Sequence, residues 1–121
     1  MVQLSDNNQN QLALLKLEEQ NAVREFARLL RSKYGNVIKE IILFGSKARG
    51  ERQQDSDIDI LIVLNGISFE IKKAISELAA QENIKHNVLI STIRYDAAAW
   101  ENPAISHSPF GQAVRNEGIW L

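Results

Sequence analysis

The chain has 121 residues, of which 45% are hydrophobic and 24% are charged, and its formal net charge is −1. This composition excludes a chain that is disordered throughout, and the near-neutral charge excludes a basic surface for direct nucleic-acid binding. Because cysteine is absent, disulfides, thiolate zinc sites and thiol catalysis are also excluded.

In the first half of the chain the sequence predicts a helix followed by two strands. Residues 1–10 are polar and are expected to form a flexible tail. Residues 11–34 contain no Pro or Gly and place apolar side chains at helical spacing until Gly35. Residues 37–44 are rich in β-branched side chains, and residues 57–64 are strongly apolar, so both are expected strands.

In the second half the sequence predicts a helix, a third strand and further short helices. Ser68 is the expected N-cap of a helix over residues 68–81, and residues 84–92 are the expected third strand. Short helices are expected over residues 95–101 and 110–116, the second with Ser108 as N-cap and Pro109 at its first position. Residues 119–121 are expected to pack on the core. The predicted fold class is α/β or α+β, with a small mixed sheet flanked by helices.

The remaining general features predict a single cytoplasmic domain over residues 1–121. The N-terminal residues lack the basic start and apolar stretch of a signal peptide, and the longest apolar run, Ile58–Leu64, is too short to span a bilayer. Two histidines and no cysteine favour oxygen ligands for any bound metal, which indicates Mg²⁺ or Mn²⁺. No membrane partner is expected.

Two acidic residues interrupt the strongest predicted strand. Asp57 and Asp59 are two residues apart, so the period of a strand places both carboxylates on one face of the sheet. Two like charges this close repel each other, and a divalent cation would resolve the conflict. Taken alone, such a pair is most often solvated surface, but here it breaks the pattern of an apolar strand, as functional residues do.

A second polar feature directly follows the first predicted strand. Gly45 lets the backbone approach a ligand closely, and the turn into a short helix offers backbone N–H groups and the Ser46 hydroxyl to an anion. Lys47, Arg49 and Arg52 add positive charge nearby. A phosphate-binding turn together with a carboxylate pair indicates a nucleotide whose phosphates share a metal with the protein.

These residues resemble a known signature. The pattern Gly45-Ser46-x-Ala48-Arg49-Gly50, followed by Ser56-Asp57-x-Asp59 and an apolar run, is similar to that of the DNA polymerase β-type nucleotidyltransferases. The resemblance is greatest to the small branch of that superfamily, the minimal nucleotidyltransferases (MNT), which the chain also matches in length and element order. It differs from the Walker P-loop in its spacing.

The resemblance implies roles for individual residues. Gly45 and Ser46 would hold the β- and γ-phosphates of ATP, and Asp57 and Asp59 would bind Mg²⁺ ions that bridge those phosphates. Arg49 would steady the loop or reach a phosphate, or else form a structural ion pair with a nearby acid. Lys47 and Arg52 are expected to be exposed charges. The implied reaction is attack on the α-phosphate with loss of pyrophosphate.

The sequence departs from the superfamily at the third strand. Members of the superfamily carry a third carboxylate there, whereas residues 84–92 contain no Asp or Glu. Asn87 is the best-aligned position and His86 the second choice; Asn cannot act as a general base, and alternation places His86 with the core.

The resemblance also implies a partner. MNT proteins often pair with an all-helical HEPN protein as a toxin–antitoxin system, in which the MNT antitoxin adenylylates a tyrosine of the HEPN toxin. This is the expected function. Two alternatives stay open: an antitoxin that neutralises its partner by binding without transfer, and nucleotidyl transfer to a small molecule.

Overall fold

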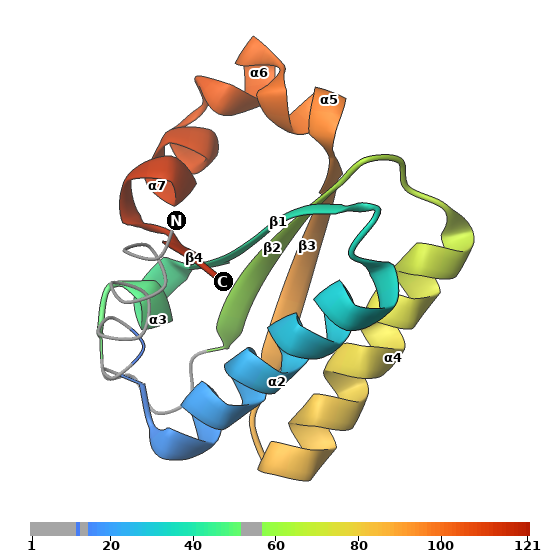
Figure 1. Cartoon of the computed structure of the whole chain (residues 1–121). Helices are drawn as coiled ribbons and strands as arrows, with labels where there is room; N and C mark the ends of the chain where they lie inside the picture. Colours follow the sequence, from blue (N-terminus) through green and yellow to red (C-terminus); the bar gives the residue numbers. More distant parts are fainter. Residues whose placement is uncertain (1–11, 13–14, 52–56) are drawn as a thin grey trace.

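The computed structural model describes Leu12, residues 15–51 and residues 57–121. Helices and strands alternate along most of the chain, and three consecutive helices precede the last strand (Figure 1). In chain order they are α2 (Leu17–Tyr34), β1 (Ile38–Phe44), α3 (Gly45–Ala48), β2 (Ile58–Leu64), α4 (Phe69–His86), β3 (Ile90–Asp96), α5 (Ala97–Glu101), α6 (Pro103–Ser106), α7 (Pro109–Glu117) and β4 (Ile119–Trp120). The predicted tail over residues 1–10, Arg52 and Ser56 lie outside the described residues.

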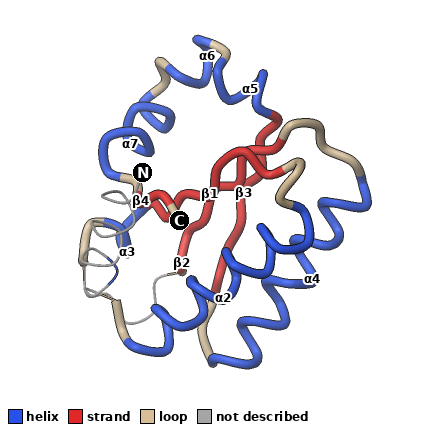
Figure 2. Tube along the Cα trace, viewed as in Figure 1, coloured by secondary structure: helices blue, strands red, loops and turns tan. Residues whose placement is uncertain are grey.

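The four strands form one mixed sheet in the order β3-β2-β1-β4 (Figure 2). β1 pairs antiparallel with β2 and β4, whereas β2 and β3 run parallel and are connected by α4. The C-terminal residues pack back onto β1 through β4, as predicted, and the backbone N–H of Leu121 donates to the carbonyl of Ile41. The predicted small mixed sheet with flanking helices is confirmed.

Helices cover both faces of the sheet (Figure 1). α2 and α4 pack on one face, where alternate strand residues point into the larger core. α5, α6 and α7 lie over the other face, around the buried Trp100 and Val114. The central members of the larger core are Phe26, Leu30, Ile41, Leu43, Ile58, Ile60, Ile62 and Ile75.

Local signals set several helix ends as predicted. The Ser68 hydroxyl accepts a hydrogen bond from the backbone N–H of Ile71 at 3.1 Å, and the Ser108 hydroxyl accepts one from the N–H of Gly111 at 3.0 Å. Each cap satisfies a donor that the first helical turn leaves without a partner. Pro109 occupies the first turn of α7, where its missing N–H costs nothing.

The predicted third strand over residues 84–92 is wrong in its first half. α4 continues to His86, and Asn87 then ends it in the left-handed conformation, with φ of 53°. The helix was expected to end at residue 81, but neither Gly nor Pro stands there to end it. Asn is one of the few residues that tolerate positive φ at the end of a helix. The strand therefore begins only at Ile90, and Ile84, taken as a core strand residue, is 85% exposed on the helix.

Among the described residues, no helix combines the length and apolar character that crossing a membrane requires.

Candidate functional site

The fold brings the two halves of the motif together. Phe44, the last residue of β1, pairs with Asp59 of β2, so Gly45 follows directly beside Asp59. Gly45 has φ of +75°, and a Cβ built on it would lie 2.6 Å from Oδ2 of Asp59. Glycine is therefore required here twice, for its backbone conformation and for the space that the Asp59 carboxylate occupies.

The acidic pair belongs to the sheet face away from the larger core. Ile58 and Ile60 flank Asp59 and are buried in that core, so alternation directs Asp59 to the opposite face. Asp57 immediately precedes β2, two residues earlier, and both acidic side chains are half-buried. The charge of Asp57 acts on Asp59, so the two carboxylates lie near each other at the start of the strand.

The electrostatics of this pair favour a cation. Burial raises the pKa of the Asp59 carboxyl above its usual value of 3.8, and the negative charge of Asp57 raises that pKa further. Both effects disfavour the ionised carboxylate, and a divalent cation would reverse both, because it replaces lost hydration and cancels the repulsion. The residues present therefore fit an oxygen-ligated metal such as Mg²⁺.

Lys47 was expected to be exposed, and this is wrong. Its side chain is 5% exposed, and its Nζ lies 2.8 Å from Oε2 of Glu19 on α2. The ion pair ties α3, and with it Gly45 and Ser46, to α2. The sequence contained a signal for this buried ion pair. Glu19 lies in one row with the buried residues Leu15 and Ala22, and a buried charge requires a partner.

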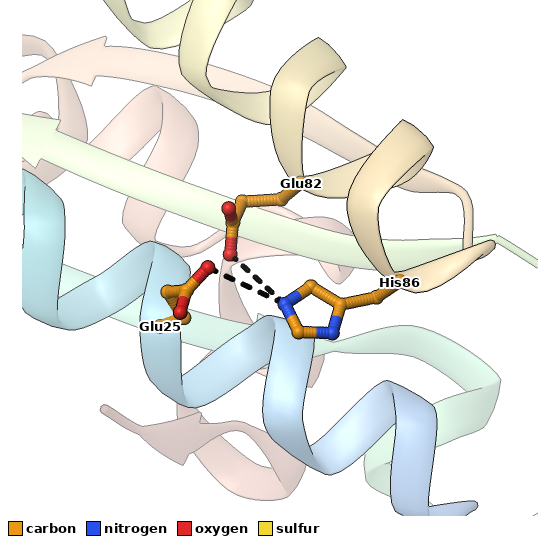
Figure 3. A group of neighbouring side chains, drawn as sticks. All are labelled: Glu25, Glu82 and His86. Carbon is orange, nitrogen blue, oxygen red and sulfur yellow. Dashed lines mark hydrogen bonds and ion pairs between the residues drawn. The ribbon is translucent and has the colours of Figure 1, made fainter.

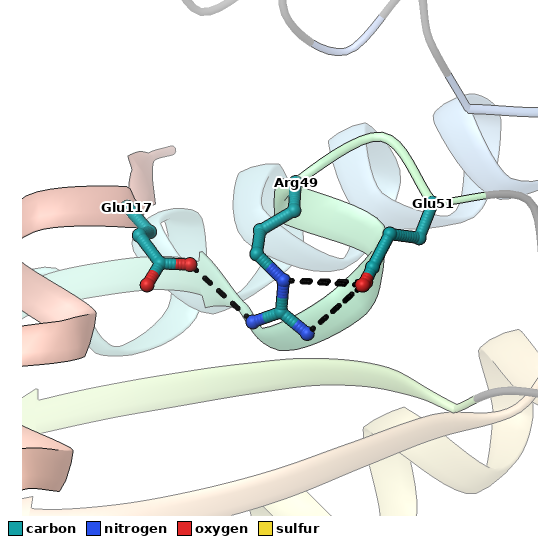
Figure 4. Close-up of polar contacts among 3 residues, drawn as sticks. All are labelled: Arg49, Glu51 and Glu117. Atoms are coloured by element: carbon teal, nitrogen blue, oxygen red, sulfur yellow. Dashed lines mark hydrogen bonds and ion pairs between the residues drawn. The ribbon is translucent and has the colours of Figure 1, made fainter.

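Arg49 forms the ion pairs that were one of its two predicted roles (Figure 4). Its guanidinium contacts Glu51 at 3.2 Å and Glu117, at the end of α7, at 3.3 Å. Hydrogen bonds from the guanidinium to these two carboxylates raise the pKa of Arg49. The loop after α3 is thereby linked to α7, through a side chain that remains about half exposed.

The structure corrects the expected position of Asn87. Asn87 is the exposed C-cap of α4 and lies before β3, so it does not occupy the strand position beside the acidic pair. Ser91 is the residue paired with Asp59 across the parallel β2–β3 ladder, and the carbonyl of Leu89 accepts a hydrogen bond from Ile58. By alternation Leu89, Ser91 and Ile93 share the face of Asp59, and none of these three carries a carboxylate.

His86, the second choice for that position, lies elsewhere. It is in the last turn of α4, where its ring contacts Glu25 of α2 and Glu82 of α4. These helices cover the opposite face of the sheet from Asp59. His86 therefore does not contribute to the candidate site.

Comparison with known proteins supports a relationship along most of the chain. The family model described as Nucleotidyltransferase domain matches residues 23–116. The candidate protein adenylyltransferase MJ0604 of Methanocaldococcus jannaschii is 43% identical over 77 residues, which cover 64% of this chain and 73% of that protein. Protein adenylyltransferase MntA of Thermococcus cleftensis is 42% identical over 52 residues, which cover 42% of this chain and 50% of that protein.

A solved structure shares the fold. A chain in the crystal structure of a mutant of the toxin-antitoxin MntA-HpeT superposes with a TM-score of 0.55 at 23% identity, covering 81% of this chain and 69% of that chain. The arrangement of sheet and helices described above is therefore also found in an experimental structure.

Proposed function

This chain belongs to the nucleotidyltransferase family, in its minimal (MNT) branch, and from that premise we propose that it transfers AMP from ATP to a protein hydroxyl group. The observation that carries the proposal is that the Asp59 carboxylate occupies the space beside Gly45 where a Cβ would lie. It brings a turn suited to phosphate within reach of a carboxylate pair suited to a metal.

We assign the binding roles to the residues of the turn and of the carboxylate pair. The backbone N–H groups after Gly45 and the Ser46 hydroxyl would donate hydrogen bonds to the β- and γ-phosphates of ATP. Asp57 and Asp59 would hold the divalent cation, Mg²⁺ or Mn²⁺. When bound, such an ion supplies charge neutralisation at the phosphates and orients the reacting oxygens. The buried ion pair between Lys47 and Glu19 holds α3, and with it the turn, against α2.

The reaction joins the acceptor oxygen to the α-phosphorus of ATP and breaks the bond from that phosphorus to the β-phosphate oxygen, so pyrophosphate leaves. The acceptor hydroxyl loses its proton in the same step. Because Leu89, Ser91 and Ile93 offer no base beside Asp59, that proton passes to water or to a base of the acceptor protein.

The acceptor we propose is a tyrosine of a HEPN-type helical toxin, with this chain as the antitoxin. Two relatives are named as protein adenylyltransferases, and the chain of similar fold comes from a toxin-antitoxin structure.

Arg49 forms ion pairs with Glu51 and Glu117, so we assign it to holding the loop after α3 and not to binding a phosphate.

One observation favours a second candidate, an antitoxin that neutralises its toxin by binding alone. The β3 positions beside the acidic pair carry Leu89, Ser91 and Ile93, whereas the superfamily pattern has a carboxylate on this strand. Without that group transfer would be slow, and binding would be the remaining means of neutralisation.

Intact-mass spectrometry of the HEPN-type partner separates the two candidates. The partner is co-expressed with wild-type chain or with Asp57→Ala, purified, and incubated with ATP and Mg²⁺; Glu77→Gln, which alters an exposed carboxylate of α4, is the matched control. We expect the mass of one AMP group on the partner with wild type and Glu77→Gln, and none with Asp57→Ala. A stable complex without any mass gain would instead support the binding antitoxin.

A further inference from the structure

A second polar cluster lies between α2 and α4, on the opposite face of the sheet from Asp57 and Asp59 (Figure 3). Glu25 comes from α2, and Glu82 and His86 come from the last turns of α4, where a spacing of four places both on one side of the helix. The three side chains point toward one another (Figure 3). The proposed nucleotide site does not use any of these three residues.

The distances within this cluster match those between metal ligands. Nε2 of His86 lies 3.4 Å from Oε1 of Glu25 and 3.5 Å from Oε1 of Glu82. One ligand atom from each residue lies within 4.8 Å of the other two. In a tetrahedral zinc site with bonds of about 2.0–2.1 Å, neighbouring ligand atoms are about 3.3–3.5 Å apart.

Glu82 supplies an independent indication of a ligand. Its side chain is 3% exposed, and its Oε1 atom has no hydrogen-bond partner among the described residues. This same atom faces the His86 ring (Figure 3). A buried carboxylate oxygen without a hydrogen-bond donor is costly. Burial raises the pKa of Glu82, and the neighbouring Glu25 carboxylate raises that pKa further. A cation between the three residues would satisfy the Glu82 oxygen.

Two neighbouring cations bear on the charge of the cluster. Nζ of Lys85 lies 2.7 Å from Oε1 of Glu25, and Arg28 lies nearby on α2. The hydrogen bond from Lys85 lowers the pKa of Glu25 to about 2, and a metal would compete with Lys85 for the same Glu25 oxygen. Lys85 is 60% exposed, so its flexible side chain can move into solvent and release the Glu25 oxygen to a metal.

We propose that Glu25, Glu82 and His86 form a Zn²⁺ site that links α2 to α4. Imidazole combined with carboxylates suits zinc, whereas Mg²⁺ prefers oxygen ligands alone. A water molecule would complete the tetrahedron. The site would stabilise the helical layer without touching the nucleotide, so it is independent of the proposed transfer reaction. It also differs from the expectation of oxygen ligands for any metal in this chain.

Calorimetric titration of the full chain with ZnCl₂, and separately with MgCl₂, tests the proposal. Glu82→Gln and His86→Gln should each weaken Zn²⁺ binding by at least about tenfold. Glu82→Gln keeps the shape of the side chain and removes a buried charge, so it should fold without metal. The matched control is Glu77→Gln, on the exposed side of α4, which should bind Zn²⁺ as wild type does.

A double variant separates the two metal sites. Asp57→Asn with Asp59→Asn removes the acidic pair and should keep Zn²⁺ binding at this cluster, together with the rise in Tm that Zn²⁺ causes in the wild type. That rise should be absent in His86→Gln. The proposal is overturned if the wild type does not bind Zn²⁺, or if Zn²⁺ affinity is unchanged in both Glu82→Gln and His86→Gln, which would mean that the three side chains pack together without holding a metal.

Discussion

At the scale of single residues, the contact between Gly45 and Asp59 connects the backbone of one strand end to the side chain of the next. The sequence predicted that both residues matter, Asp59 because it breaks the pattern of an apolar strand and Gly45 because it allows close approach of a ligand. It did not predict that they touch, since the contact depends on the register that pairs Phe44 with Asp59. That register is set by the whole β1–β2 ladder.

Gly45→Ala should reduce ATP affinity by at least about tenfold, because its Cβ would displace the Asp59 carboxylate. The positive φ alone should cost about 1–2 kcal/mol of unfolding free energy. Gly66→Ala is the matched control: Gly66 also has positive φ, but nothing lies within 4 Å of its Cβ position. It should lose comparable stability and keep ATP affinity, measured by urea unfolding and by calorimetry. Equal ATP affinity in the two variants would show that the contact with Asp59 is irrelevant to binding.

The raised pKa of Asp59 predicts a pH-dependent stability. An acid whose pKa is higher in the folded state loses stability as pH rises from its unfolded value, here about 3.8, through the folded value. Asp59→Asn removes this loss, so without metal it should be more stable than wild type at pH 7, and the difference should vanish below pH 3.8. Urea unfolding across pH measures this. A variant that is less stable than wild type at pH 7 would mean that the charge of Asp59 is already compensated in the free protein.

At the scale of elements, helix starts that carry a capping hydroxyl were predictable, whereas the end of α4 and the burial of Lys47 on α3 were not. Ser68 and Ser108 cap their helices as expected, because the hydroxyl and the N–H that it accepts from are close in sequence. The end of α4 was missed because Ile84 suits a strand by type, while Asn87 ends the helix without a glycine. The burial of Lys47 was missed because its partner, Glu19, lies far away in the chain.

The Glu19–Lys47 ion pair predicts a large loss on removal of one partner. Lys47→Met should lower the free energy of unfolding by about 3 kcal/mol or more, because it leaves the Glu19 carboxylate buried without its cation. Lys73→Met, in the exposed pair with Glu77, is the control and should cost about 0.5 kcal/mol or less. Urea unfolding of both variants measures the two losses in unfolding free energy. A loss for Lys47→Met no larger than for Lys73→Met would exclude a structural role for the buried pair.

The corrected position of β3 predicts where a third carboxylate would act. Ser91→Asp or Leu89→Asp places a carboxylate on the face of Asp59, and a general base there typically adds a factor of about 10² or more in rate. At least one of the two variants should speed AMP transfer by about tenfold or more, whereas Asn87→Asp, at the C-cap of α4, should leave the rate unchanged. If the rate rises only with Asn87→Asp, the assignment of the β3 positions is wrong.

At the scale of the whole molecule, the two faces of the sheet have different roles. The face under α2 and α4 holds the larger core, and with it the Glu25–Glu82–His86 cluster. The other face carries Asp59 at one end. Beyond it, the rings of Phe44, Trp100 and Phe110 pack together under α5, α6 and α7. This division was implicit in the alternation of β2, but the placement of the last three helices required the assembled sheet.

The measurement that tests the central claim most directly is calorimetric binding of ATP to wild type and to Asp59→Asn, with and without Mg²⁺. We propose that the turn at Gly45 and Ser46 and the pair Asp57 and Asp59 form one site. This arrangement leads to a clear expectation. It predicts that Mg²⁺ strengthens ATP binding to the wild type and has no effect on Asp59→Asn. An equal effect of Mg²⁺ on both proteins would show that the acidic pair does not hold the metal that accompanies the nucleotide.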